Sequence, residues 1–168
     1  MPFYYPNPQN DMWRIMGQVF YADKMRFVNP REVSKSGMGG DSVFKYKEIV
    51  AFCEEKGIAI FDTAQAVIRL RDNAADEHLQ IVEPTDIAVL LRQLPMCGDI
   101  CCTGQKAADI LADILGCLPP KIGTYSETEY IGRQLLFWRM PSSSRAYPLP
   151  FEKKVEAYSR MMQAIGLK

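Results

Sequence analysis

The sequence predicts an α/β fold, a three-layer α/β/α sandwich around a short central, mainly parallel sheet. Apolar residues recur at helical spacing in five segments, and short apolar runs typical of strands lie between these segments. The run at 99–102 lacks the alternation of a half-buried strand, so we expect it to be buried on both faces between helices. With 168 residues, of which 48% are hydrophobic, the chain fits a single domain spanning residues 1–168.

The first predicted helix carries Trp13, Met16 and Phe20 on one face, and Asn10-Asp11 before it can cap its start. Four further apolar stripes predict four more helices. They are Val43, Tyr46, Val50 and Cys53; Ile87, Leu90, Leu91 and Leu94; Ala107, Ile110, Leu111 and Ile114; and Phe151, Val155, Tyr158, Met162 and Ile165. Glycines follow the second, fourth and fifth helices, whereas Pro84-Thr85-Asp86 starts the third and Pro95 ends it.

Three short apolar segments predict strands: IAIFDTA (58–64), DICCTG (99–104) and RQLLFWRM (133–140). The segment KSGMGGDS (35–42) has the composition of a mobile loop. The chain opens with an aromatic, proline-rich segment that leads directly into a helix, whereas an α/β domain usually begins with a central strand.

The composition excludes several classes of protein. No run of about 18 apolar residues could span a membrane, and the N-terminus has no basic and apolar regions of a secretory signal. The five cysteines are irregularly spaced without a CxxC pair, and there is a single histidine, His78. The sequence therefore predicts neither a metal site nor another cofactor, and reduced cysteines fit a cytoplasmic protein.

The net charge is zero, but the charges are unevenly distributed. Residues 1–36 have a formal balance of +2 and residues 121–168 a balance of +4, whereas residues 37–120 have a balance of −6. If the fold brings the two ends together, they form a positive face suited to phosphates. Fluctuations of this size are also common in chains of this length, so charge alone decides nothing.

The opening segment FYYPNPQNDMW (3–13) is the first candidate site. Asn7 and Asn10 lie among prolines that stiffen the backbone, and Tyr4 and Tyr5 precede them. A side-chain amide offers a donor and an acceptor, which suits reading the edge of a base or holding a water. The structural alternative, which the residues alone favour, is a surface turn whose asparagines only cap the following helix.

The segment RMPSSSRAYPLP (139–150) is the second candidate site, between the last predicted strand and the last helix. Three consecutive serine hydroxyls beside Arg145, and free backbone amides at such a turn, can donate hydrogen bonds to phosphate oxygens. Tyr147 and the prolines would make the loop stiff enough to press on a duplex. The alternative is an ordinary polar connection.

The strand–turn–helix segment 99–111 is the third candidate, because α/β proteins bind ligands at the carboxyl ends of parallel strands. It contains neither a dinucleotide nor a P-loop motif, and a tight turn that needs glycine explains Thr103-Gly104 equally well. Asp62 follows the first predicted strand and could enter the same cleft, although a lone aspartate there is more often a helix cap or a surface charge.

Together these segments resemble the uracil-DNA glycosylase superfamily, most closely its hypoxanthine-DNA (deoxyinosine) glycosylase branch. YYPNPQNDMW is similar to the aromatic- and asparagine-bearing loop of the family, and MPSSSRAYPLPFEKKVEAY to its proline–serine loop with the K-x-x-A-Y pattern. IAIFDTA and DICCTGQKA match two internal strands in order, so the resemblance covers nearly the whole chain.

The resemblance implies a role for each matching residue. Tyr5, with Tyr4 beside it, would stack on an extruded base, and Asn10, with Asn7 nearby, would contact that base or position the attacking water. The loop that compresses the DNA backbone would consist of Pro141, Ser142, Ser143, Ser144 and Arg145, with Tyr147 beside it. Thr103, Gly104 and Asp62 would line the base pocket.

The chain departs from the family at its start, where the family has a central strand and a G-S-x-P loop. We therefore expect a uracil-DNA glycosylase-like domain that lacks its first strand and first motif. The implied activity is monomeric, monofunctional hydrolysis of the N-glycosidic bond of uracil or hypoxanthine in DNA. The alternatives are a non-catalytic DNA-binding relative and a hydrolase acting on nucleosides.

Overall fold

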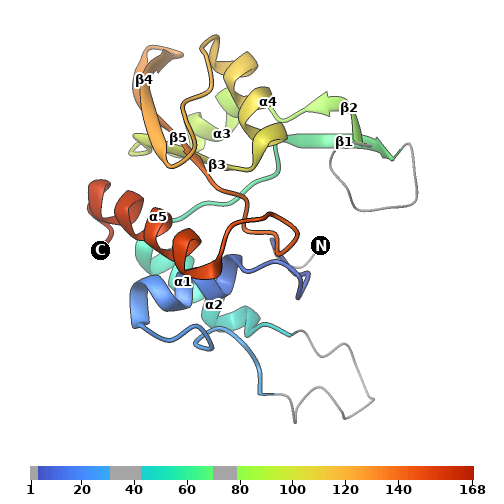
Figure 1. Ribbon diagram of the computed structural model, residues 1–168. Coiled ribbons are helices and arrows are strands. Elements are labelled where there is room, and N and C mark those ends of the chain that lie inside the picture. Colours follow the sequence, from blue (N-terminus) through green and yellow to red (C-terminus); the bar gives the residue numbers. More distant parts are fainter. Residues whose placement is uncertain (1–3, 31–42, 70–78) are drawn as a thin grey trace. The chain divides into compact units, whose positions relative to one another are not determined.

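A computed structural model describes residues 4–30, 43–69 and 79–168 of the chain (Figure 1). The chain divides into two compact units, unit 1 (Met1–Phe61 and Ser142–Lys168) and unit 2 (Asp62–Pro141). The described residues confirm an α/β protein with a small, mixed, three-stranded sheet. The loop expected at 35–42 lies outside the described residues.

Unit 1 contains three of the five predicted helices, α1 (Met12–Tyr21), α2 (Tyr46–Lys56) and α5 (Phe151–Ala164). Helix α1 lies against α5, so segments from the two ends of the chain form one body (Figure 1). The rings of Phe20 and Phe27 each lie 5.0 Å from the ring of Phe52, which is buried on α2. The largest fully buried side chains of this unit include Trp13, Ile15, Phe27, Phe44 and Tyr158.

Helix α1 is packed so closely that one position requires glycine. A Cβ atom placed on Gly17 would lie 2.5 Å from the carbonyl oxygen of Asp23 and 3.2 Å from the Cβ of Arg26. The turn after α1 therefore folds back directly onto the helix, and the missing side chain leaves the space for it.

Unit 2 contains the remaining helices and all the named strands. Its elements are β1 (Ala64–Arg69), β2 (Leu79–Pro84), α3 (Ile87–Gln93), β3 (Asp99–Thr103), α4 (Gln105–Leu115), β4 (Thr124–Tyr130) and β5 (Arg133–Met140). Strands β1 and β2 pair antiparallel as a separate two-stranded sheet. Asp86 caps α3 as expected, because its carboxylate accepts a hydrogen bond from the Val89 amide at 3.0 Å.

The three-stranded sheet has the order β3-β5-β4, with β3 parallel and β4 antiparallel to β5. Helix α4 packs on the face that carries Cys102 and Phe137, and its buried residues Ala108 and Leu111 complete a core with Leu135. The strand predictions at 99–104 and 133–140 are therefore confirmed, and these two strands pair in parallel.

Other expectations differ from the structure. Residues 58–63 form no strand: the chain leaves α2 through Gly57, the Ile58 amide donates back to the Cys53 carbonyl at 2.8 Å, and β1 begins only at Ala64. Burial of 99–102 on both faces is wrong, because Cys101 is exposed while Cys102 faces α4. Among the described strands one pair is parallel and two are antiparallel.

Candidate functional site

The opening aromatic segment is fixed to helix α1. The indole Nε1 of the buried Trp13 donates to the Tyr4 carbonyl at 3.0 Å, and the Tyr4 ring lies 6.2 Å from that of Phe61. Tyr5 adopts a left-handed backbone with a φ of 56°. Such a conformation is strained for a bulky residue and persists only where its surroundings impose it, as they often do at functional sites.

The two asparagines are held in one orientation by the backbone. The Oδ1 of Asn7 accepts from the Gln9 amide at 2.8 Å, and the Oδ1 of Asn10 accepts from the Met12 amide at 2.9 Å. Both bonds join a side-chain oxygen to the amide two residues further on, as in a structural turn; that of Asn10 reaches the first residue of α1, whereas that of Asn7 lies before the helix. They also leave each Nδ2 amino group, which has no partner among the described residues, as a donor.

The serine segment meets the opening segment directly. The Asp11 amide donates to the Ser143 carbonyl at 2.8 Å, and the Arg145 amide donates to the Gln9 carbonyl at 3.0 Å. These bonds form a short antiparallel bridge between Asn10 and Ser144, which come from opposite ends of the sequence. Both predicted end segments therefore belong to one site in unit 1.

Two backbone amides of the serine turn bind serine hydroxyls of the same turn, so the expectation of free amides is wrong for these two. The Ser144 amide donates to the Ser142 Oγ, and the Ala146 amide donates to the Ser144 Oγ, both at 3.2 Å. Because each hydroxyl oxygen accepts a bond, its proton remains available as a donor. Ser143 is buried, so the accessible donors of the turn are the hydroxyls of Ser142 and Ser144.

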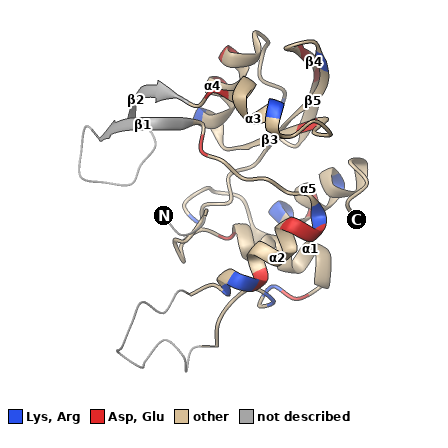
Figure 2. Ribbon diagram, turned by 180° about the vertical axis from the view of Figure 1, so that it is seen from behind, with Lys and Arg blue, Asp and Glu red and all other residues tan. Residues whose placement is uncertain are grey.

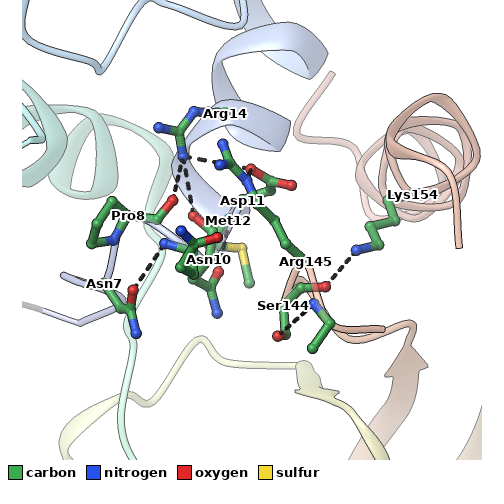
Figure 3. Close-up of polar contacts among 11 residues, drawn as sticks. Asn7, Pro8, Asn10, Asp11, Met12, Arg14, Ser144, Arg145 and Lys154 are labelled. Atoms are coloured by element: carbon green, nitrogen blue, oxygen red, sulfur yellow. Dashed lines mark hydrogen bonds and ion pairs between the residues drawn. The ribbon is translucent and has the colours of Figure 1, made fainter. Parts of the chain in front are cut away.

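A group of charges joins the two segments behind this bridge, and we call Asp11, Arg14, Arg145 and Lys154 the Asp11 cluster. The Arg145 Nε contacts the Asp11 Oδ1 at 2.8 Å, and the Arg14 Nη1 contacts the same oxygen at 3.5 Å (Figure 3). Asp11 is 7% exposed, so it is a nearly buried carboxylate shared by two guanidinium groups.

Lys154 is the member that sequence reasoning missed most completely. Lys154 is only 2% exposed. Its Nζ donates a hydrogen bond to the Ser144 carbonyl at 2.6 Å (Figure 3). The same Nζ lies 5.8 Å from the centre of the Tyr147 ring. Burial lowers the pKa of this amine; Asp11 opposes that shift and Arg145 adds to it. The K-x-x-A-Y pattern begins at Lys154 and was the signal that could have identified it.

Arg14 also holds the opening segment, through hydrogen bonds to two of its backbone carbonyls. Its Nη1 donates to the carbonyls of Pro8 at 3.2 Å and Asn10 at 3.3 Å, and its guanidinium lies over the Phe44 ring at 5.2 Å. Burial and the nearby Arg145 lower the pKa of Arg14, while Asp11 raises it. The site is therefore rigid, rich in donors and positively charged.

The other predicted site residues lie in unit 2; they are Asp62, Thr103, Gly104 and Pro141, the last residue of that unit. Thr103 ends β3, and Gly104 starts α4 with a φ of 89° and donates its amide to the Met140 carbonyl at 3.2 Å. The strand–turn–helix prediction is confirmed. Asp62 does not follow a strand but precedes β1, is exposed, and accepts at its backbone carbonyl from the Thr85 hydroxyl at 2.6 Å.

The formal charges differ between the units. Unit 1 has thirteen Lys/Arg against nine Asp/Glu, and unit 2 has seven against eleven. Unit 1, which holds the Asp11 cluster, therefore has an excess of positive formal charge. Charges of both signs occur along its helix α5 (Figure 2).

Within residues 4–30, 43–69 and 79–168, no group of three or more His, Cys, Asp or Glu side chains is arranged to hold a metal ion. In the same ranges, no helix has the length and apolar character needed to cross a membrane. No family model, curated protein or solved structure matches the chain.

Proposed function

We propose that this protein is a DNA base-excision glycosylase that hydrolyses the N-glycosidic bond of a deaminated base, uracil or hypoxanthine. The observation that carries the proposal is the bridge between Asn10 and Ser144. The two segments on which the family resemblance depends could have lain far apart, and instead hydrogen bonds join them within unit 1.

The asparagine geometry supports a contact to the base. With each Oδ1 turned onto the backbone, Asn7 and Asn10 present amino groups that can donate to the exocyclic oxygen of uracil or hypoxanthine. As the glycosidic bond breaks, the departing base gains negative charge, and a prepositioned donor stabilises that charge. The proposal therefore gives Asn10 two main tasks: it donates a hydrogen bond to the base, and it stabilises the negative charge on the base as the base leaves.

The remaining residues of unit 1 fit the other parts of such a reaction. Tyr5 would stack on the extruded base with Tyr4 supporting it, and Ser142, Ser144 and Arg145 would bind the backbone on either side, next to Tyr147. Flipping the nucleotide costs a few kcal/mol, which is least for a mispaired base. Cleavage passes through an oxocarbenium-like sugar, and water then attacks the sugar carbon.

The proposal needs neither a cofactor nor a covalent lysine. Lys154 Nζ donates to the Ser144 carbonyl, and the proposal gives it no role as a nucleophile. The protein would act as a monofunctional hydrolase without lyase activity, as a monomer in the cytoplasm, with damaged DNA as its partner.

The proposal also covers the roles of residues in unit 2 and the layered architecture of the chain. Thr103 and Gly104 keep the base-binding role that the resemblance implies, and they occupy a strand-to-helix turn, the kind of position at which α/β proteins bind ligands. Pro141 and Asp62 keep the roles that the resemblance implies. The single-domain, three-layer sandwich with a mainly parallel sheet is part of this proposal, supported by the parallel β3–β5 pair with α4 on one face.

The decisive experiment compares Asn10→Asp with the wild type on duplexes containing uracil, hypoxanthine or xanthine, followed by alkaline cleavage of abasic sites. The substituted side chain would keep the oxygen that caps the Met12 amide but lose the amino group, so the fold is retained. We expect wild-type base release and a loss of about 10²–10³-fold in kcat for the variant.

Gln163→Glu, which makes the same change of amide to carboxylate at an exposed position of unit 1 on α5, serves as the control and should not change kcat. Absence of abasic sites from all three wild-type reactions would exclude the enzyme. Equal rates for wild type and Asn10→Asp would exclude the assigned role of Asn10.

The second candidate is a DNA-binding protein without catalysis. It is favoured by one observation, that both asparagine oxygens accept bonds from nearby backbone amides, as they would in a purely structural turn. Salt-dependent duplex binding without base release would establish it. Release of base from free deoxyinosine or deoxyuridine would instead identify a nucleoside hydrolase.

A further inference from the structure

The three-stranded sheet of unit 2 has two unlike faces. Helices α3 and α4 pack on one of them, where Leu91 and Leu111 form one core with Phe137 of β5. Because successive side chains of a strand point to opposite faces, the neighbours of these positions form the other face. We call it the Trp138 face, and it contains Asp99, Cys101, Tyr125, Glu127, Leu136 and Trp138.

Contacts within the sheet confirm which side chains share this face. The Trp138 ring lies 4.6 Å from the Tyr125 ring, and its indole Nε1 donates to the Asp99 Oδ1 at 2.9 Å. Trp138 is 5% exposed, whereas Tyr125 is 48% exposed, and Glu127 on the same strand is also exposed. The face therefore presents a tyrosine ring to solvent, packed against a buried tryptophan.

The sheet separates its charges between the two faces. Its three carboxylates, on Asp99, Glu127 and Glu129, all lie on the Trp138 face. Its two arginines lie on the helix face: Arg133 donates to the carbonyl of the residue after α3 at 2.8 Å, and Arg139 donates to a carbonyl of the loop between α4 and β4 at 3.2 Å. Strands β3, β4 and β5 thus give the Trp138 face three negative formal charges and no positive one.

We propose that the Trp138 face is a docking surface for an arginine-bearing segment of a partner protein. Charge complementarity selects this occupant, because an acidic or a wholly apolar partner would approach the carboxylates without supplying an opposite charge. A guanidinium group can stack on an aromatic ring and donate to a carboxylate at the same time, whereas the ammonium group of lysine acts as a point charge.

Tyr125 and Glu127 supply this pair of contacts. They are two residues apart on β4, so their Cα atoms are about 7 Å apart on one face, within reach of a single arginine side chain. In the described part of the chain, Glu127 has no hydrogen-bond or ion-pair partner, so its carboxylate can accept from the segment. Asp99 positions Trp138 against the Tyr125 ring through its hydrogen bond with the indole.

The docking surface goes beyond the proposed function and does not rest on it. It lies in unit 2, whereas Asn7, Asn10 and the Asp11 cluster belong to unit 1. Carboxylates repel phosphodiesters, so changes to the Trp138 face should leave base release from damaged duplexes unchanged. The base-release assay therefore separates a failure of this surface from a failure of the glycosylase.

The test titrates the ¹⁵N-labelled full chain with a hexa-arginine peptide and follows its NMR signals. The chain has two tryptophans, and Trp13 is buried in unit 1, so its indole N–H is an internal control for that of Trp138. We expect the Trp138 indole signal and the backbone amide signals of β4 to shift, while the Trp13 indole signal stays in place. Shifts confined to α4 or to unit 1, or no shift at all, would overturn the docking surface.

Fluorescence anisotropy of labelled hexa-arginine gives the Kd of each variant. We expect Glu127→Gln, which removes the charge, and Tyr125→Leu, which removes the ring but stays apolar, each to weaken binding about threefold. Hexa-lysine should bind the wild type about threefold more weakly than hexa-arginine. Asp113→Asn removes the same charge from an exposed position on α4 and is the matched control, with an unchanged Kd.

Two results of these measurements would overturn the proposal. One is an equal loss of affinity in Glu127→Gln and Asp113→Asn, which would show attraction to the charge of the unit as a whole. The other is equal binding of the two peptides by a chain indifferent to Tyr125→Leu.

Sedimentation velocity of the chain without peptide tests the other occupant, a second copy of this protein. A monomer at all concentrations supports a separate partner. A dimer that Glu127→Gln dissociates would identify the second copy as the occupant and overturn the proposal.

Discussion

At the scale of single residues, Asp11 precedes helix α1 without a capping bond from its side chain, and its carboxylate pairs with arginines instead. Its carboxylate lies between Arg14 on the same helix and Arg145 from the far end of the sequence. It therefore joins the two segments electrostatically, in addition to the backbone bridge beside it. Removing it leaves cations facing one another in a poorly hydrated place.

We expect Asp11→Asn to lower the free energy of unfolding by about 3 kcal/mol, because one partner of a nearly buried ion pair is lost. Urea denaturation followed by circular dichroism measures this change. Glu152→Gln removes the same charge from an exposed position on α5 and should change stability by less than about 0.5 kcal/mol. Similar losses in the two variants would show that Asp11 is not a specific support.

Cys53 on α2 provides a second test at this scale. Burial and, secondarily, Glu54 raise the pKa of its thiol from 9.0 to about 11. Since the thiolate is the nucleophile, Cys53 should react with iodoacetamide near pH 8 about 100-fold more slowly than an ordinary thiol.

Mass spectrometry of peptides from folded and urea-unfolded protein measures this ratio at Cys53. The same raised pKa makes the free energy of unfolding depend on pH. The folded state holds its proton above pH 9 while the unfolded state loses it, so the contribution of Cys53 is complete below pH 9 and is lost between pH 9 and about 11. Equal alkylation rates in the two states would contradict the expected protection.

At the scale of elements, helix α1 depends on the glycine against which its following turn packs. In Gly17→Ala the added methyl would meet the Asp23 carbonyl at 2.5 Å. Overpacking against a backbone oxygen at this distance costs about 2–3 kcal/mol, the upper part of the usual range, and the better helix propensity of alanine returns about 1 kcal/mol. We expect a net loss of about 1–2 kcal/mol by urea denaturation, whereas Gly98→Ala, where nothing lies within 4 Å, should be neutral.

The hairpin between β4 and β5 contains a strained residue. Ile131 and Gly132 form its two-residue turn, and both have a positive φ, 49° and 74°. A β-branched residue is unfavourable there, so Ile131→Asn should raise the melting temperature, with a gain of about 1 kcal/mol. Calorimetry measures the gain, and Ile122→Asn at another exposed position is the control.

The elements show what the sequence could and could not predict. All five helices were predictable, because each combines an apolar stripe with a cap or a breaker, as Asp86 illustrates for α3. Strand β5 was predictable from its apolar run. Strand β4, with the sequence TYSETEY, was missed because it is a polar edge strand held by pairing with β5, which local composition does not report.

The residues 58–64 show the opposite error. Their apolar composition is typical of a strand, but Gly57 and the Ile58 amide are committed to closing α2, and pairing starts only where β2 is available as a partner. A strand requires a neighbour, whereas a helix satisfies its own backbone. This difference explains why the helices were predicted better than the strands.

At the scale of the whole molecule, the meeting of the two end segments was predictable only through the family resemblance. Asn10 and Ser144 were both predicted as site residues, and the structure places them opposite each other. Lys154 was missed, because a lysine in a helix pattern is usually exposed, as its neighbour Lys153 is, and only tertiary packing buries it.

The division of the chain into two units predicts how fragments of the protein should fold. Unit 2 is continuous, whereas unit 1 consists of residues 1–61 and 142–168. We expect the fragment 62–141 to fold alone, with dispersed amide signals in NMR spectra, because it has its own core around Phe137. Residues 1–61 alone should stay largely unfolded and become helical when the peptide 142–168 is added.

The discontinuity of unit 1 also has a consequence for biosynthesis. Domains generally fold as units as they leave the ribosome, N-terminal parts first. Here α1 is translated before unit 2, but its partner α5 and the lysine that holds the serine turn are translated after it. The proposed site therefore cannot assemble until unit 2 has been made, and translation that stops after residue 141 would yield a protein with unit 2 intact and no site.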